Sequence, residues 1–299
     1  MSNLKQNLPA SIHQRLLNKA HETGRAFNEL IQYYALERFL YRLSVSKYAE
    51  QFTLKGALMF NAWGLANTRP TRDIDLLGHA PNQIEQIVNI VRDICKLDVA
   101  RDGLEFDADE IQGEHIKEDA EYEGIRVSLM ARLGNTRLPI QIDIGFADVI
   151  TPEPERVEYP TILDFPAPHL FGYPPETVVA EKFQAMTVLG MANSRMKDFY
   201  DIWTLANHFK FDGAMLQRAI ERTFQNRNTE LPDESSVIFS NEFVNQKAEQ
   251  WISFGRKIRG KESIEMAQVV QLLREFLIPV IRASKQAILF KKTWTGNWD

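Results

Sequence analysis

Apolar residues recur at helical spacing through the first 50 positions. Ser11 is a candidate N-cap for a helix that continues to about His21 and ends before Gly24. A second apolar stripe runs from Phe27 to Leu43 in steps of three and four residues. This pattern predicts a helical hairpin that packs on the segments that follow.

The clearest strand pattern lies between residues 122 and 146. Ile125–Leu129 alternates apolar and polar residues, Gly134–Arg137 has the composition of a turn, and Leu138–Gly145 alternates again. Asp143 falls on the face opposite to its neighbouring isoleucines. The sequence therefore predicts an antiparallel hairpin that presents Asp143 on a sheet face.

A shorter alternation of acidic and apolar residues occupies positions 73–77. Asp73 and Asp75 share one face of the predicted strand, roughly 7 Å apart, and Ile74 and Leu76 share the other. Two carboxylates this close are unfavourable unless positive charge lies between them. Mg²⁺ binds through a few carboxylates and substrate phosphates, so this strand is a candidate metal site.

The residues before this strand add a candidate phosphate site. A turn at Lys55-Gly56 is predicted to open a helix within the apolar run from Phe52 to Trp63, and residues 67–70 have a turn-like composition. The backbone of a glycine can approach a phosphate closely because no side chain intervenes. Lys55 is either a cation that neutralises this phosphate or an ordinary surface lysine.

The remaining pattern is mostly helical. The apolar stripe of residues 81–97 predicts a helix, whereas the acidic segment 98–123 is consistent with short strands or with a loop. Residues 151–175 are rich in proline and predict a connection, after which Pro175 suits the first position of a helix. Helices follow to the end of the chain, and Pro279 is expected to kink or interrupt the last long one.

This order of elements predicts an α/β fold with a small mixed β-sheet. We expect an N-terminal helical segment over residues 1–50, the core over residues 51–175 and a C-terminal helical region over residues 176–299. The chain has 299 residues, 44% of them hydrophobic and 25% charged, which is ample for a packed core.

Composition changes this picture only in detail. The single cysteine excludes an internal disulfide, and the start of the chain lacks a signal peptide, so we expect a cytoplasmic protein. No apolar run reaches the ~18 residues of a membrane span. The net charge of −5 argues against general binding of polyanions. The segment Arg256–Asp299 is basic and carries Trp294 and Trp298, which are either candidates for stacking on an acceptor or part of an ordinary amphipathic helix and tail.

Three acids on two strands match the carboxylate set of two-metal phosphoryl transfer: Asp73, Asp75 and Asp143. Other interpretations stay open. The Asp73/Asp75 pair is also typical of a solvated edge strand, and Asp143 could be the partner of a buried cation. A solvated pair with Glu181 is the ordinary explanation of Lys182, and Asp198 is explained by its position near the start of a helix.

Five segments together resemble the AbiEii/AbiGii nucleotidyltransferase family, in the DNA polymerase beta-like nucleotidyltransferase superfamily. They are L-K-G-A, R-P-T-R-D-I-D-L, Q-I-D-I-G, A-E-K-F-Q-A and K-D-F-Y-D-I, in this order, within residues 52–207. Members of this family are toxin components of toxin–antitoxin and phage-defence systems. The resemblance implies a nucleotidyltransferase-like fold.

The resemblance also implies roles for individual residues. The metal ligands would be Asp73, Asp75 and Asp143, and Lys182 and Asp198 would complete the catalytic set. Nucleotide binding would involve Lys55, Gly56, Ala57, Arg72 and Asp201. Ala57 departs from the family, which commonly has a second Gly or Ser at this position.

The function implied is transfer of a nucleoside monophosphate from a nucleoside triphosphate, with Mg²⁺ or Mn²⁺, to an acceptor such as the 3′ end of tRNA. A cognate antitoxin would be a partner. Two alternatives remain open. A metal-dependent nuclease would use similar acids, and a catalytically idle nucleotide-binding module would act through a partner.

Overall fold

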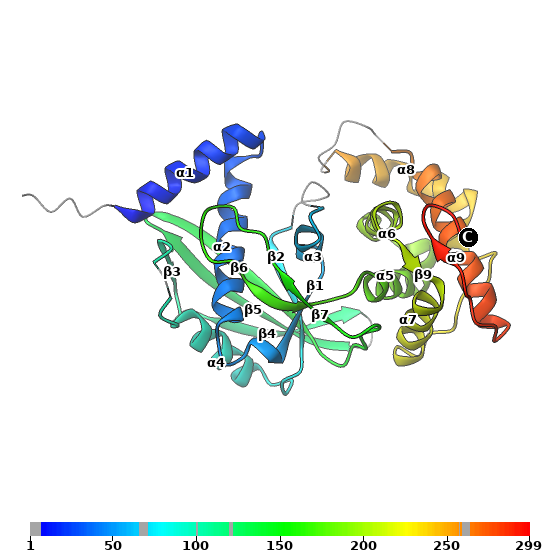
Figure 1. The fold of residues 1–299 in the computed structure, drawn as a ribbon, viewed down its shortest axis with the longest axis horizontal. Helices are drawn as coiled ribbons and strands as arrows, with labels where there is room; N and C mark the ends of the chain where they lie inside the picture. The colour runs from blue at the N-terminus through cyan, green and yellow to red at the C-terminus, as the bar shows by residue number, and fades with distance from the viewer. Residues whose placement is uncertain (1–6, 66–70, 100, 120–121, 257, 259–263) are drawn as a thin grey trace, which may run out of the picture. The chain divides into compact units, whose positions relative to one another are not determined.

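The computed structural model describes residues 7–65, 71–99, 101–119, 122–256, 258 and 264–299 (Figure 1). The chain forms two compact units. The first contains the described residues up to 147 together with 156–172, and the second contains 148–155 and 173–299. The turn-like segment 67–70 lies outside the described residues.

The first unit is built on a mixed sheet of eight described strands. Their order is β3-β5-β6-β2-β1-β8-β7, and β4 also pairs with β5. The strands are β1 (Phe52–Lys55), β2 (Asp73–Gly78), β3 (Leu104–Phe106), β4 (Gln112–Asp119), β5 (Tyr122–Leu133), β6 (Thr136–Gly145), β7 (Glu155–Glu158) and β8 (His169–Gly172). Because β2 runs parallel to β6 and antiparallel to β1, the predicted mixed α/β fold is confirmed.

The hairpin of β5 and β6 forms as its alternating pattern predicts. Ile140, Ile142 and Ile144 of β6 are at most 1% exposed. Residues in register on adjacent strands point to the same side of the sheet, so Val127, Ile142 and Ile74 together form part of the buried face. The polar residues of these strands lie on the opposite face.

The helices of the first unit are α1 (Leu8–Thr23), α2 (Phe27–Ser44), α3 (Leu58–Ala62) and α4 (Ile84–Cys95), with a short 3₁₀ turn at Ala49–Gln51. Figure 1 shows α2 and α4 lying along the sheet. The predicted N-terminal helical hairpin is confirmed, and Gly24 ends α1 in the left-handed region with φ +66°. The N-cap prediction is wrong, because Asn7 accepts the hydrogen bond from the Ala10 amide and Pro9 is tolerated in the first turn.

In the first unit, two segments form strands that the sequence pattern did not predict. Residues 52–55 form β1 and are all buried although Thr53 and Lys55 are polar, and the helix after Gly56 is only five residues long. The proline-rich segment 151–175 is more than a connection, because it contains β7 and β8, and β8 pairs with β1 in parallel. Both misses concern strands of only four residues, which are too short for a periodic pattern to stand out.

The second unit is helical. It contains α5 (Pro175–Leu189), α6 (Met196–His208), α7 (Gly213–Asn226), α8 (Asn241–Gly255) and α9 (Met266–Lys285), with 3₁₀ turns at Gly190–Ala192 and Val237–Phe239 and a two-stranded sheet of β9 (Phe211–Asp212) and β10 (Thr293–Trp294). Pro175 stands at the start of α5 as predicted. Helix α9 continues through Pro279 without interruption.

Contacts between aromatic rings fill the core of the second unit. Phe183 lies 5.3 Å from Phe224, and Phe276 lies 4.9 Å from Trp294, measured between ring centroids. In the part of the chain that the structure describes, no helix is both long and apolar enough to span a membrane.

Candidate active site

Two of the predicted acids face each other across adjacent strands. Asp75 of β2 is in register with Asp143 of β6, and Asp73 is in register with Gln141. Strands in a sheet are about 4.8 Å apart, and side chains in register share a face. The structure therefore brings Asp73, Asp75 and Asp143 together on the face of the sheet opposite to the buried isoleucines.

Gly56 lies directly against this group of acids. Lys55 pairs with Asp75 across β1 and β2, and Gly56 follows at the end of β1 with φ +71°. A Cβ added to Gly56 would lie 1.9 Å from Oδ2 of Asp75. Only glycine therefore allows both this backbone conformation and this approach to the carboxylate. Ala57 comes next and is 7% exposed.

The lysine and arginine predicted at this end of the site differ in exposure. Lys55 is 6% exposed, so it is not the ordinary surface lysine that was one alternative. Arg72, just before β2, is exposed. The amide of the preceding residue, Thr71, donates a hydrogen bond to the Tyr33 hydroxyl.

Arg126 of β5 is a site residue that the sequence reasoning missed. Its Nε and Nη2 donate to the two carboxylate oxygens of Asp143, both at 2.8 Å, and the Gln141 amide donates to the same oxygens at 3.2 Å. Hydrogen bonding to Asp143 raises the pKa of Arg126, and the charges of Asp73 and Glu114 add to the effect. Counting outward from the turn at Gly134-Asn135 would have placed it opposite Asp143.

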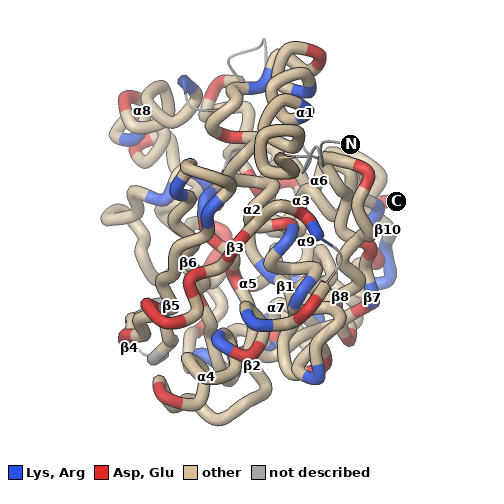
Figure 2. The backbone as a smooth tube through the Cα atoms, turned by 90° about the vertical axis from the view of Figure 1, so that its left-hand side faces the viewer, with Lys and Arg blue, Asp and Glu red and all other residues tan. Residues whose placement is uncertain are grey.

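Five charged residues thus lie along one row of the sheet, with two acids side by side at its centre. In register order the row runs Lys55, Asp75, Asp143, Arg126 and Glu114, from β1 through β2, β6 and β5 to β4. Figure 2 shows basic and acidic residues interspersed along the chain. Each central acid of the row has a basic residue on its outer side.

The residues fit a divalent cation in donor type and in adjacency. Carboxylate oxygens are the hard ligands that Mg²⁺ and Mn²⁺ prefer. Among the described residues, no group of three or more His, Cys, Asp or Glu side chains is already arranged as a metal cage. Asp143 gives one reason why these residues are not arranged as a cage: both of its carboxylate oxygens already accept hydrogen bonds from Arg126.

The remaining predicted residues form a second charged cluster, inside the helical unit. Nζ of Lys182 on α5 lies 2.8 Å from Oδ1 of Asp198 and 2.9 Å from Oδ2 of Asp201, both on α6. The two acids are fully buried. Arg195, which the sequence reasoning missed, places its Nε 2.7 Å from the other oxygen of Asp198.

This cluster changes the interpretation of Lys182. Its carboxylate partners come from the next helix, and its side chain is only 12% exposed, so a solvated pair with Glu181 is not what the structure shows. Asp198 stands in the first turn of α6, where a negative charge is also favourable. The sequence motif that contains Asp198 and Asp201 places both acids on the side of α6 that meets α5.

The tryptophan prediction at the C-terminus is wrong for Trp294. Its side chain is 1% exposed, and its Nε1 donates to the carbonyl of Ala206 at 2.6 Å. Trp298 stacks on Phe276 with an interplanar angle of 5° and donates to the Phe276 carbonyl. Trp294 is therefore a core residue of the helical unit and cannot stack on a base.

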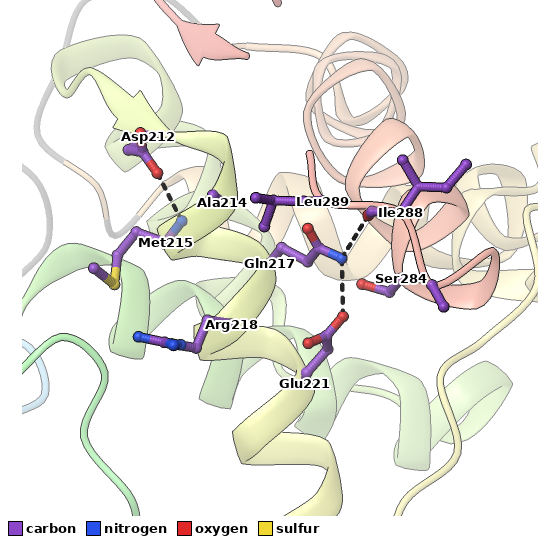
Figure 3. Close-up of a pocket in the computed structure, with 10 residues that line it drawn as sticks. Asp212, Ala214, Met215, Gln217, Arg218, Glu221, Ser284, Ile288 and Leu289 are labelled. Carbon is purple, nitrogen blue, oxygen red and sulfur yellow. Dashed lines mark hydrogen bonds between the residues drawn. The ribbon is translucent and has the colours of Figure 1, made fainter. Parts of the chain in front are cut away.

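A hollow of about 620 Å³ between α7 and the end of α9 contains none of the predicted residues (Figure 3). Its central polar group is Gln217, which donates to the carboxylate of Glu221 and to the carbonyl of Ile288, both at 3.0 Å. Because this amide already donates hydrogen bonds within the protein, the hollow is a less suitable binding site for a charged ligand than the row of charged residues on the sheet.

Comparison with known proteins decides the family. Residues 38–274 match the sequence profile of "Nucleotidyl transferase AbiEii toxin, Type IV TA system", which is more than half of the chain. The chain belongs to the AbiEii family. It is therefore a member of a family of nucleotidyltransferase toxins, whose type IV systems pair the toxin with an antitoxin.

Two solved structures are similar to this AbiEii-family chain. The "Crystal structure of putative nucleotidyltransferase from H. pylori" has a TM-score of 0.50 at 12% identity, covering 87% of this chain and 97% of the other. "Crystal structure of JHP933 from Helicobacter pylori" has a TM-score of 0.48 at 12% identity, covering 84% and 92%. At this identity the first similarity shows a shared nucleotidyltransferase-like fold and nothing more. No curated protein matches the chain.

Proposed function

We propose that this AbiEii-family chain transfers a nucleoside monophosphate from a nucleoside triphosphate to an acceptor, a reaction of the EC 2.7.7 type. One observation supports the proposal above all: Asp75 is in register with Asp143 while the Gly56 backbone lies against the Asp75 carboxylate. Acids that can hold a cation thus adjoin the end of β1, where this proposal places the triphosphate.

In this proposal Asp73, Asp75 and Asp143 hold Mg²⁺ or Mn²⁺. The cation, when bound, neutralises charge on the triphosphate and on the departing pyrophosphate. Gly56 and Ala57 provide backbone contacts to the triphosphate, and Lys55 and Arg72 supply positive charge. Lys55 is nearly buried next to Asp75, so its charge acts in a poorly solvated place.

Lys182 is proposed to contact phosphate. Asp198 and Asp201 would hold the ammonium group of Lys182 in place. Two hydrogen-bond-length ion pairs to fully buried carboxylates fix the ammonium group in one position. An ammonium held in this way loses little further freedom when it binds an anion, which favours binding. The assignment rests on the family motif, and the geometry is compatible with it.

The proposed acceptor is RNA, in particular the 3′ end of tRNA, and the proposed setting is the cytoplasm, in phage defence. Family membership supports this part of the proposal. The aromatic contribution expected from Trp294 is absent, because that ring belongs to the core.

The test is incubation of the protein with each labelled nucleoside triphosphate, Mg²⁺ and a tRNA pool. Label gained by RNA is the expected result, and Asp75→Asn should reduce it at least about 100-fold, in the range seen when a major electrostatic contact to the transition state is removed. Asp164→Asn, at an exposed acid of the same unit, is the matched control.

Other outcomes of this experiment identify the alternatives. RNA that is shortened without gaining label would indicate a nuclease. In a parallel measurement of cell growth on expression of the protein, toxicity that persists undiminished in Asp75→Asn would indicate a module that acts by binding alone. Either outcome would overturn the proposed transfer reaction.

A further inference from the structure

The guanidinium of Arg126 occupies the position from which a cation can interact with Asp143. It forms two parallel hydrogen bonds of 2.8 Å to the carboxylate, a paired geometry that satisfies both oxygens. A divalent ion that used the same oxygens would compete with these bonds. Arg126 is also close enough to Asp73 to interact with its charge, so it faces two of the three acids proposed as metal ligands.

The ion pair is positioned so that it can exchange partners. The Asp143 side chain is 13% exposed and the Arg126 side chain is 34% exposed, so solvent reaches the guanidinium. By comparison, the Arg42–Asp102 pair in the same unit is at most 6% exposed on either side. Breaking a fully buried ion pair costs a large free energy, whereas a partly exposed pair can separate at a moderate cost in free energy because water solvates the separated charges.

We propose that Arg126 and a divalent cation compete for Asp143, and that the displaced guanidinium then binds the phosphates of the incoming nucleotide. This inference rests on the proposed function. Once a cation is held by Asp75 and Asp143, Arg126 has a positive charge beside it and has lost its two-point carboxylate partner. A polyphosphate is the anion that arrives with the metal, and its oxygens suit the planar fork of an arginine.

The proposal predicts that one substitution changes the affinities for Mn²⁺ and for the nucleotide in opposite directions. Arg126→Gln removes a positive charge that is hydrogen-bonded to Asp143, so Mn²⁺ alone should bind more tightly, by about three- to tenfold after allowance for solvent screening. A non-hydrolysable nucleoside triphosphate analogue, added with saturating Mn²⁺, should bind about tenfold more weakly because a phosphate contact is lost. A purely structural role would not separate the two affinities in this way.

The measurement is a Mn²⁺ titration followed by electron paramagnetic resonance, and a calorimetric titration of the analogue, on the full chain. Arg132→Gln is the matched control, because Arg132 lies on the same face of β5, has a side chain 44% exposed and pairs loosely with Asp107 at 3.7 Å. Arg126→Lys keeps the charge without the fork and should give a smaller gain in Mn²⁺ affinity. Circular dichroism verifies that each variant is folded.

The outcomes separate this inference from the proposed function. If Asp75→Asn weakens Mn²⁺ binding but Arg126→Gln leaves it within twofold of the unsubstituted protein or weakens it, the exchange is wrong and Arg126–Asp143 is a permanent ion pair. If Asp75→Asn does not weaken Mn²⁺ binding, the metal site itself is wrong and the proposed function fails together with the exchange.

Discussion

Gly56 carries two constraints that act on the same atoms. Its φ of +71° lies where L side chains are strained, and its missing Cβ leaves the space that Oδ2 of Asp75 occupies. Gly24 has a similar φ of +66°, but a Cβ added there would meet no atom of the described residues within 4 Å. The two glycines therefore separate the cost of backbone strain from the cost of displacing Asp75.

We expect Gly56→Ala and Gly24→Ala to lose similar stability from backbone strain, about 1–2 kcal/mol each, measured by urea unfolding. Only Gly56→Ala should also lose nucleotidyl transfer, by at least about tenfold, because the alanine Cβ must push the Asp75 carboxylate away. Equal transfer rates in the two variants would show that the position of Asp75 does not matter for the reaction.

At the scale of elements, the site depends on one parallel and two antiparallel strand pairings. The register of β2 with β6 decides that Asp75 rather than Asp73 meets Asp143, and a shift by one residue would turn the acids toward the isoleucine core. Helix α2 packs on the other face of this sheet. An ion pair connects α2 to the segment before β3. Arg42 donates to both oxygens of Asp102, at 2.6 and 3.1 Å.

Asp102→Asn should destabilise the first unit by about 3–5 kcal/mol, because it leaves the Arg42 guanidinium buried without its charge partner. Thermal unfolding followed by circular dichroism measures this loss. Asp164→Asn is the control, since it removes an exposed ion pair with Arg15 at 3.4 Å and should change the midpoint little. A small effect of Asp102→Asn would mean that solvent reaches this pair.

At the scale of the whole molecule, the two compact units each carry one of the charged clusters proposed for the reaction. The sheet unit holds the acids and Gly56, and the helical unit holds Lys182 with Asp198 and Asp201. Ligand that binds the native protein stabilises it according to its concentration relative to its dissociation constant.

A non-hydrolysable triphosphate analogue with Mg²⁺, at about 100 times its dissociation constant, should stabilise the protein by about 2.7 kcal/mol and raise its midpoint by several degrees. Chelation of the metal, or Asp75→Asn, should abolish the shift. Lys182→Met should reduce it if the second cluster binds the same nucleotide. A shift that survives both Asp75→Asn and chelation would place nucleotide binding elsewhere.

Elements with a local signal could be predicted from the sequence without any coordinates. The helical hairpin, the strand at Asp73–Leu77 and the hairpin around Gly134 follow from periodicity and turn composition, because these patterns reflect the immediate surroundings of each residue. The family motifs likewise indicated the candidate site residues Asp73, Asp75, Asp143, Lys182 and Asp198.

Which of these residues are neighbours depended on the fold. The fully buried β1, the late strand β8 and the burial of Trp294 all depend on contacts between distant segments. Apolar periodicity shows that a side chain is covered and does not show what covers it. The register of β2 against β6 and the approach of Gly56 to Asp75 are likewise set by the packing of the sheet as a whole, because strand pairing is cooperative and non-local.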